Sequence, residues 1–456
     1  MRLPVRRTTQ LRILAVLVCT VVLTWQTGPF SRVRSDEGDQ TVHKEAMKLY
    51  ELLSKKERAK RLNVLFHARD NATRPRVTTV SCPRLWAGNV DAEYLRKAAS
   101  VKTSVTRQSR DLVQETLNCT SYILNNGFRS ASVSEEELSF PLAFSLMVYR
   151  DVQQVERLLR AVYRPHNLYC VHVDRKSGLG FQSSLRLIVG CLPNVFINER
   201  SLDVRWGNYS VLEPELECMR RLWSLGARWR YFINLTGQEF PLKTNKELVA
   251  ILKSFRGAND IRGTQLRKFQ SRWNKNLPAP FNLTVTKGSK LIIASRGFVD
   301  YVVNSRVSRV LQEWVRKTEI PDETFFSTLN HNPRLGVPGS LKGNHIVDTD
   351  VNEGEFSRYL LWIRTKQGSL CKGKFVRGVC VFGVGDLPYL TQVPYLFANK
   401  FHYGFQPLAY DCLEEWYFLK IHHENIGRPI EPPLNMTVYV NSYLAKDVYT
   451  GPVKLW

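Results

Sequence analysis

A strand, a helix and a second strand follow one another in residues 142–174, LAFSLMVYRDVQQVERLLRAVYRPHNLYCVHVD. Residues 142–149 and 168–174 are short apolar runs of the length expected for buried strands. Between them, apolar residues at positions 152, 155, 158, 159 and 162 recur at the helical period. This order predicts two parallel strands joined by a crossover helix.

The same alternation continues toward the C-terminus. We expect strands at 194–198 and 230–235 and helices at 214–225 and 245–255. A capping box marks the start of the last helix, because Glu247 follows Thr244 by three residues. The sequence therefore predicts an α/β fold with a doubly wound, mostly parallel sheet and helices on both faces. Ligands of such sheets bind beyond the carboxyl ends of the strands.

The N-terminus has the pattern of a signal anchor, with a cleaved signal peptide as the alternative. Three arginines and no acid lie within the first seven residues, and Arg12 sits at the edge of the apolar run from Ile13 to Trp25. No small-residue cleavage pattern follows this run. Positive charge before the run predicts a cytoplasmic N-terminus and a lumenal remainder. The expected organisation is a cytoplasmic tail (1–9), a transmembrane signal anchor (10–28), a lumenal stem (29–138), a catalytic domain (139–428) and a C-terminal tail (429–456) with one strand at 437–440.

The cysteines support a secretory compartment. The chain has nine, and Cys19 lies inside the apolar run. The eight that remain are an even number beyond a secretory signal, which predicts four disulfides. Eight cysteines allow 105 pairings, and spacing alone does not choose among them. No CxxC pair is present, which argues against a zinc cluster.

Glycosylation sequons and charge agree with a lumenal address. The chain has six N-x-S/T triplets and a formal net charge of +24. Asn234 lies in an apolar run and is expected to be buried, so the expected glycan sites are Asn71, Asn118, Asn208, Asn282 and Asn435. A basic surface attracts anionic partners. A lumenal address argues against nucleic acid and leaves acidic glycans and nucleotide sugars as partners. The alternative is a solvated basic surface without a specific partner.

Two acidic motifs are candidates for chemistry. Asp174 ends the second strand, where a carboxylate could bind uracil or ribose while Arg175 and Lys176 face phosphate. The alternative is an ordinary charged loop. Glu323 ends the segment Pro321-Asp-Glu before an apolar run. It could act as a general base, or it could only favour the dipole of a helix start.

A leaving diphosphate must be neutralised by a metal or by side chains. Asp348-Thr-Asp350 has the Asp-x-Asp pattern of a metal site. It follows the Glu323 segment instead of an early strand, so we interpret it as a solvated turn. Arg377 and Lys400 lie within apolar runs, where cations tend to have partners. They are the candidates to hold a diphosphate.

Taken together, several segments resemble the core 2 β1,6-N-acetylglucosaminyltransferase family, the branching enzymes of mucin-type O-glycans in glycosyltransferase family 14. The matching segments run in family order from about residue 140 to about 415. They are ERLLRAVY (156–163), YCVHVDRK (169–176), FINLTGQEFPLKTN (232–245), PDE (321–323), VCVFGVGDL (379–387) and LFANKF (396–401).

The resemblance implies a GT-A-like fold and an inverting transfer of N-acetylglucosamine (GlcNAc) from UDP-GlcNAc, in β1,6 linkage and without a metal cofactor. Glu323 matches the catalytic base, and Arg377 and Lys400 match the pair that holds the diphosphate. The other implied donor-binding residues are Met147, Val148, Tyr149, Asp174, Arg175, Lys176 and Trp206. The implied acceptor-binding residues are Arg272, Trp273, Trp362 and Arg364. The implied disulfides are Cys82–Cys412, Cys119–Cys191, Cys170–Cys218 and Cys371–Cys380.

The resemblance also implies a partner, an address and some differences. Glycoprotein O-glycans are the expected acceptors, with Galβ1,3GalNAc first among them, and the Golgi membrane is the expected location. A homodimer remains an open alternative. Arg262 lies near a position where the family has a glutamate, and Arg364 and Trp206 each replace a family tyrosine. The resemblance therefore predicts the donor chemistry more directly than the choice of acceptor. Protein O-xylosyltransferase, which uses UDP-xylose, and a non-catalytic glycan-binding protein or chaperone on the same scaffold are the competing hypotheses.

Overall fold

The computed structural model describes residues 77–102, 109–128, 133–226, 228–264, 267–273, 277–342, 355–429, 432–446 and 448–451. The expected cytoplasmic tail, signal anchor and Asp348-Thr-Asp350 lie outside these ranges. Among the described residues, no helix is both long and apolar enough to cross a membrane.

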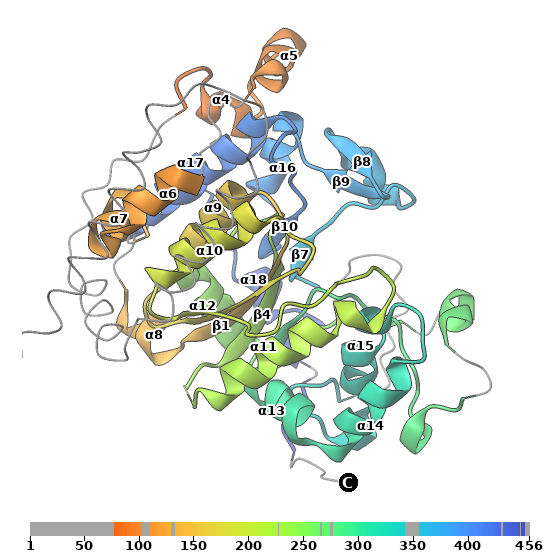
Figure 1. Ribbon diagram of the computed structural model, residues 1–456. Coiled ribbons are helices and arrows are strands. Elements are labelled where there is room, and N and C mark those ends of the chain that lie inside the picture. Colours follow the sequence, from red (N-terminus) through yellow and green to blue (C-terminus); the bar gives the residue numbers. More distant parts are fainter. Residues whose placement is uncertain are drawn as a thin grey trace, which may run out of the picture.

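A five-stranded sheet forms the centre of the molecule (Figure 1). Its order is β3 (Val195–Ile197), β2 (Leu168–Val173), β1 (Leu142–Val148), β4 (Tyr231–Thr236) and β6 (Ile293–Ser295). Only the β4–β6 pair is antiparallel, so the mostly parallel sheet expected from the alternating pattern is confirmed.

Helices cover both faces of this sheet, as predicted. Phe144 and Leu146 of β1 belong to the core under α9 (Val152–Val162), α10 (Leu179–Gly190) and α12 (Asn245–Ser254). Ala143, on the opposite face, belongs to a second core with α11 (Glu213–Ser224), α13 (Arg296–Asn304), α14 (Arg306–Val315) and α15 (Phe325–Asn330). Alternate residues of a strand point to opposite faces, which explains how β1 serves both cores.

A smaller sheet and a hairpin complete the C-terminal half. The small sheet has the order β5 (Glu239–Pro241), β10 (Phe397–Asn399) and β7 (Arg358–Tyr359). Strands β8 (Lys374–Val376) and β9 (Val379–Val381) form a hairpin that projects from the body (Figure 1). A third core joins the small sheet and β9 to α4 (Cys82–Trp86), α5 (Ala92–Ser100), α16 (Leu387–Leu390) and α17 (Pro407–Asn425).

Four disulfides tie the early part of the chain to the globular domain and brace that domain. They join Cys82 to Cys412, Cys119 to Cys191, Cys170 to Cys218 and Cys371 to Cys380. These are the pairs that the family resemblance implied.

The expected stem contributes to the globular domain. Its described part contains α4 and α5, together with α6 (Ser109–Thr116), α7 (Cys119–Asn125) and α8 (Glu135–Ser139). Leu112, Ile123 and Phe128 are buried in the core beneath α9 and α10. This distal portion therefore packs on the sheet domain like the elements that follow it.

The strand predicted at 437–440 is wrong. Residues Thr437–Val440 form the helix α18, followed by α19 (Tyr443–Lys446). Two valines and a threonine suggested a strand, but tertiary packing decides the conformation. The Tyr439 ring lies 4.9 Å from that of Phe356, and its hydroxyl donates to the Pro394 carbonyl at 2.6 Å. The C-terminal segment thus contributes an aromatic side chain to the core.

Candidate active site

The carboxyl ends of β1 and β2 lie side by side. Val148 pairs with Val173, and the Asp174 amide donates to the Val148 carbonyl at 3.0 Å. The Lys176 ammonium lies 3.0 Å from the Asp174 carboxylate and 2.7 Å from that of Asp203. The structure thus brings the expected donor residues of both strand ends together, and it pairs Lys176 with two acids.

The loop that follows Asp203 reaches the turn that carries Glu323. The Ile320 amide donates to the Gly207 carbonyl at 2.9 Å. Next to Gly207, the Trp206 side chain is 81% exposed and so is available to a ligand. The loop that carries Trp206 therefore connects the end of β2 to the turn that carries Glu323.

Glu323 lies at the end of a single 3₁₀ turn, Pro321–Glu323, directly before α15. The Arg272 Nη1 atom lies 2.5 Å from Glu323 Oε2. The Trp273 indole nitrogen donates to the Thr324 hydroxyl at 3.2 Å. Two residues expected on the acceptor side are therefore held against the expected base and its neighbour. Burial raises the pKa of the adjacent Asp322 to about 6.

Lys287 is a further neighbour of Glu323, which sequence reasoning missed. Its ammonium lies 3.7 Å from Glu323 Oε2. Burial lowers the pKa of Lys287, while the Glu323 charge raises it. Residue 287 belongs to a segment without regular periodicity, and one lysine among 65 basic residues gives no local signal.

Glu355, which acts on Lys287 electrostatically, forms a buried acidic pair with Asp260. The Arg262 Nε atom is 3.8 Å from Glu355 Oε1. Burial raises the pKa of Glu355 to about 7, although Arg262 and Lys287 oppose the shift. Burial, and then the charge of Glu355, raise the pKa of Asp260 to about 8. Arg262, which stands near an expected glutamate, is thus a partner of Glu355.

The other charged region surrounds the hairpin β8–β9. Arg377 and Gly378 form its turn with φ values of 53° and 77°, and two positive φ values are typical of a type I′ turn. The Lys400 ammonium donates to the carbonyl of Val376, the residue before Arg377, at 3.1 Å. The structure thus brings together the two residues expected to hold the diphosphate.

This region has a cationic character that a diphosphate could neutralise. Burial lowers the pKa of Lys400, and the charges of Arg377 and Arg150 lower it further. Burial also lowers the pKa of His402 to about 4, with further contributions from Lys400, Arg150 and Lys374. Arg150 lies two residues beyond the end of β1, in the strand-end region where ligands of such sheets bind, although sequence reasoning assigned it no specific role. Its position there connects the strand end with the phosphate-holding pair.

Trp362, expected on the acceptor side, lies against this hairpin, and the other expected residue, Arg364, follows it by two positions. Trp362 forms a β-bridge with Val379, and the Ile363 amide donates to the Gly378 carbonyl at 2.9 Å. The Trp362 side chain is 41% exposed, so it offers an aromatic face to solvent. The backbone therefore couples an expected acceptor residue to the donor hairpin.

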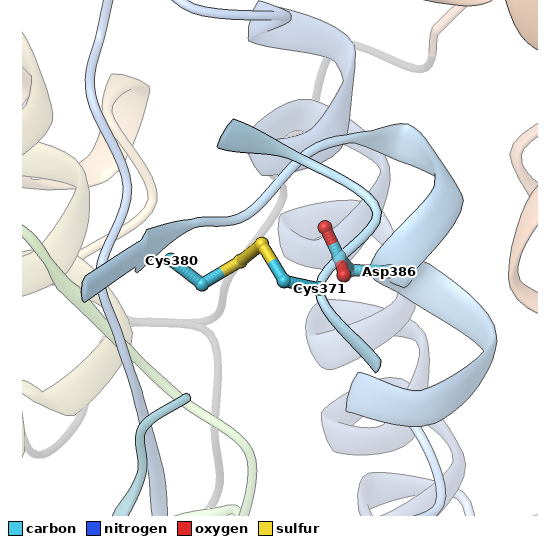
Figure 2. Close-up of side chains that lie close together, drawn as sticks. All are labelled: Cys371, Cys380 and Asp386. Atoms are coloured by element: carbon cyan, nitrogen blue, oxygen red, sulfur yellow. A yellow bond between two sulfur atoms is a disulfide. The ribbon is translucent and has the colours of Figure 1, made fainter. Parts of the chain in front are cut away.

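One group of potential metal ligands occurs among the described residues, at Cys371, Cys380 and Asp386. Figure 2 shows the two sulfur atoms bonded to each other, with the Asp386 carboxylate close by. That carboxylate accepts hydrogen bonds from the Lys372 and Gly383 amides, both at 2.7 Å. A disulfide offers no thiolate, so we interpret this group as a brace of the hairpin.

The sequons differ in accessibility. Asn118, Asn208, Asn282 and Asn435 are exposed, whereas Asn71 lies outside the described residues. Asn234 is 1% exposed; its amide donates to the Lys290 carbonyl at 2.7 Å and accepts from the Ile292 amide at 2.7 Å. The burial expected for Asn234 is confirmed.

Chemically, the site combines a carboxylate held by cations with a separate cluster of cations. A positioned carboxylate can remove a proton from a hydroxyl. Arginine and lysine can stabilise the charge of a departing diphosphate. The arrangement suits group transfer from a nucleotide diphosphate to a hydroxyl.

Comparison with known proteins agrees with this geometry. The human beta-1,3-galactosyl-O-glycosyl-glycoprotein beta-1,6-N-acetylglucosaminyltransferase is 32% identical over 365 residues, which cover 74% of this chain and 84% of that protein. The mouse N-acetyllactosaminide beta-1,6-N-acetylglucosaminyl-transferase is 35% identical over 325 residues, which cover 66% of this chain and 79% of that protein. The family model for the Core-2/I-Branching enzyme matches residues 142–390, which contain both the Glu323 turn and the Arg377 hairpin. The chain therefore belongs to the Core-2/I-branching enzyme family.

Proposed function

We propose that the protein transfers GlcNAc from UDP-GlcNAc in β1,6 linkage onto an O-glycan, as in core 2 branching. The observation that carries the proposal is the Glu323 carboxylate, which Arg272 holds at 2.5 Å. Its turn contacts the loop of the exposed Trp206 through the hydrogen bond from Ile320 to Gly207. The names of the relatives support the donor sugar and the linkage. Galβ1,3GalNAc on glycoproteins is the acceptor we favour.

The transfer inverts the donor sugar in one displacement. As the C6 oxygen of the acceptor attacks C1 of GlcNAc, Glu323 takes the hydroxyl proton. The bond between C1 and the diphosphate oxygen breaks, and its electron pair leaves with UDP. Arg377 and Lys400 stabilise the negative charge that develops on UDP, and Arg150 adds positive potential nearby.

Side chains replace a divalent metal in this mechanism. Arg377 and Arg150 both lie close enough to Lys400 to affect it electrostatically, so the three cations can stabilise a diphosphate together. We therefore expect no metal requirement. A chelator such as EDTA should leave turnover unchanged, and a dependence on added Mn²⁺ or Mg²⁺ would contradict this part of the proposal.

Two acceptor classes deserve direct comparison. One relative is named for a β1,3-galactosyl O-glycan and another for N-acetyllactosaminide. Around the site, Arg262 is partnered with Glu355, and Arg364 is exposed. A panel that includes Galβ1,3GalNAc and N-acetyllactosamine will distinguish core 2 from I-type branching.

We also propose a type II orientation in the Golgi membrane, with the catalytic domain in the lumen. Four disulfides support an oxidising compartment. The anchor is the apolar run at 10–28, which begins after a basic segment. Protease protection in microsomes, with epitopes at each end, tests this: only the N-terminal epitope should be cleaved.

The experiment that tests the function is a donor and acceptor assay of the purified protein. UDP-GlcNAc and UDP-xylose are compared with each acceptor, with and without EDTA, and the product linkage is determined by NMR. We expect β1,6-linked GlcNAc. Transfer of xylose alone would support the xylosyltransferase hypothesis, and glycan binding without any transfer would support a non-catalytic role.

A further inference from the structure

The two cations beside Glu323 contact the same carboxylate oxygen. Arg272 Nη1 lies 2.5 Å and Lys287 Nζ 3.7 Å from Oε2. Within the described part of the chain, only Oε2 accepts a hydrogen bond from a cation, and no hydrogen bond reaches the other oxygen, Oε1. The carboxylate is therefore asymmetric, with one oxygen held and the other open to a ligand.

The backbone fixes Lys287 in this place. Lys287 and Thr264 exchange two hydrogen bonds, at 2.7 and 2.8 Å, in an antiparallel bridge. The next amide, that of Gly288, donates to the Glu323 carbonyl at 2.6 Å. Lys287 is thus tied through the backbone to the residue that its side chain contacts.

The surroundings leave Lys287 little freedom. Its side chain is 19% exposed, and Glu323, Arg262, Arg272 and Glu355 act on it electrostatically. Two acids and two other cations therefore surround the ammonium. Loss of its charge would leave Glu323 with a single cation, Arg272, among its contacts in the described chain.

We propose that Lys287 is a positioning residue for the transfer reaction, a role that rests on the proposed function. Together with Arg272 it holds Oε2, so that Oε1 is the atom that accepts the acceptor proton. Protonation of Oε2 would require displacing a cation, whereas Oε1 can bind the hydroxyl directly. In the transfer, the proton moves from the acceptor oxygen to Oε1 as that oxygen bonds to C1 and UDP departs.

The test compares Lys287→Met with Lys287→Arg. Methionine keeps most of the side-chain length and apolar contact but removes the charge, whereas arginine keeps the charge. Lys253→Met is the matched control, because Lys253 pairs with Glu136 on the surface of α12, far in sequence from the site. Each variant is assayed for kcat, acceptor KM, UDP affinity, thermal stability and the pH dependence of kcat.

We expect Lys287→Met to lower kcat by about 10- to 100-fold, part of the effect of a well-placed general base. UDP affinity should stay within about threefold, because the diphosphate site is elsewhere. The acidic limb of the kcat profile should move to higher pH, because a cation that favours the ionised carboxylate has been removed. Lys287→Arg should restore the wild-type limb and most of kcat.

Two results would overturn the inference. One is an unchanged kcat and acidic limb in Lys287→Met. The other is an equal loss of kcat in both variants with an unmoved limb, which would indicate a purely structural role. A wild-type protein without transferase activity would instead refute the proposed function, and the inference with it.

Discussion

Lys400 is expected to strengthen binding of the UDP donor while it lowers the stability of the protein without donor. Its ammonium is partly buried and lies near Arg377 and Arg150, so its pKa falls below the usual 10.5. In a Lys400→Met variant, this burial cost and repulsion disappear. The hydrogen bond to the Val376 carbonyl, at 3.1 Å, disappears as well. The variant should therefore lose UDP affinity without losing stability.

The magnitudes follow from these contacts. A hydrogen bond to a charged group contributes about 1.5–3 kcal/mol, so the Kd for UDP should rise about 10- to 100-fold. The lost bond to Val376 is also made by the charged ammonium and costs about 1.5–3 kcal/mol, which the relief of the burial cost and of the repulsion offsets. The melting temperature of the free protein should therefore change by no more than about 3 °C.

The two effects should also depend on pH in opposite directions. Lys400 binds its proton less tightly in the free fold than in the unfolded chain. Stability should therefore rise as pH increases from the lowered pKa toward 10.5. UDP binding requires the charged ammonium, so affinity should fall over the same window.

Isothermal titration calorimetry with UDP and thermal melts of the free protein measure both quantities. Lys253→Met, an exposed lysine paired with Glu136, is the control and should change neither. A Lys400→Met protein that binds UDP like the wild type, or that melts many degrees lower, would refute this interpretation of Lys400.

Three other variants probe the scaffold around the site. Burial raises the pKa of Asp260 to about 8, so the folded protein loses stability as the pH rises from 5 and this carboxyl ionises. Asp260→Asn should reduce that loss and stabilise the protein at pH 8. Identical thermal melts of the two proteins from pH 5 to 9 would contradict this. Replacing Cys371 and Cys380 together by serine should cost about 2–3 kcal/mol in the chain-entropy model and weaken UDP binding, and unchanged urea unfolding would argue against it. Gly288→Ala should lower both stability and kcat, since a Cβ there would meet a backbone carbonyl oxygen at 2.2 Å; a fully active, equally stable variant would contradict this.

Local sequence patterns predicted the central sheet well. The helix expected at 152–162 is α9, Val152–Val162, and the capping box of Thr244 and Glu247 starts α12 as expected. These elements carry their periodicity and their end signals within a few residues.

Elements that depend on distant partners could not be predicted. Strands β5, β7 and β10 have two or three residues each, so none has a detectable period. Strand β10 pairs with β5 across more than 150 positions and with β7 across 39. The helix α18 was mistaken for a strand because its β-branched residues favour a strand locally. The burial of Tyr439 depends on packing against distant residues, which the local sequence does not show.

The candidate site shows the same division. Family resemblance supplied Glu323, Arg377 and Lys400, because each lies in a recognisable segment. Lys287 and Arg150 had no such segment, and their proximity to the site arises only when the chain folds. The 3.7 Å contact between Lys287 and Glu323, for example, joins residues 36 positions apart.

The role of Glu323 is tested most directly by comparing turnover in Glu323→Gln and wild type with UDP-GlcNAc and Galβ1,3GalNAc. Glu319→Gln is the control, since Glu319 is an exposed carboxylate in the same segment. Loss of the base should lower kcat by about 10²- to 10⁴-fold while UDP still binds, and the control should keep its activity. A folded Glu323→Gln protein that turns over like the wild type would contradict the assignment of Glu323 as the base.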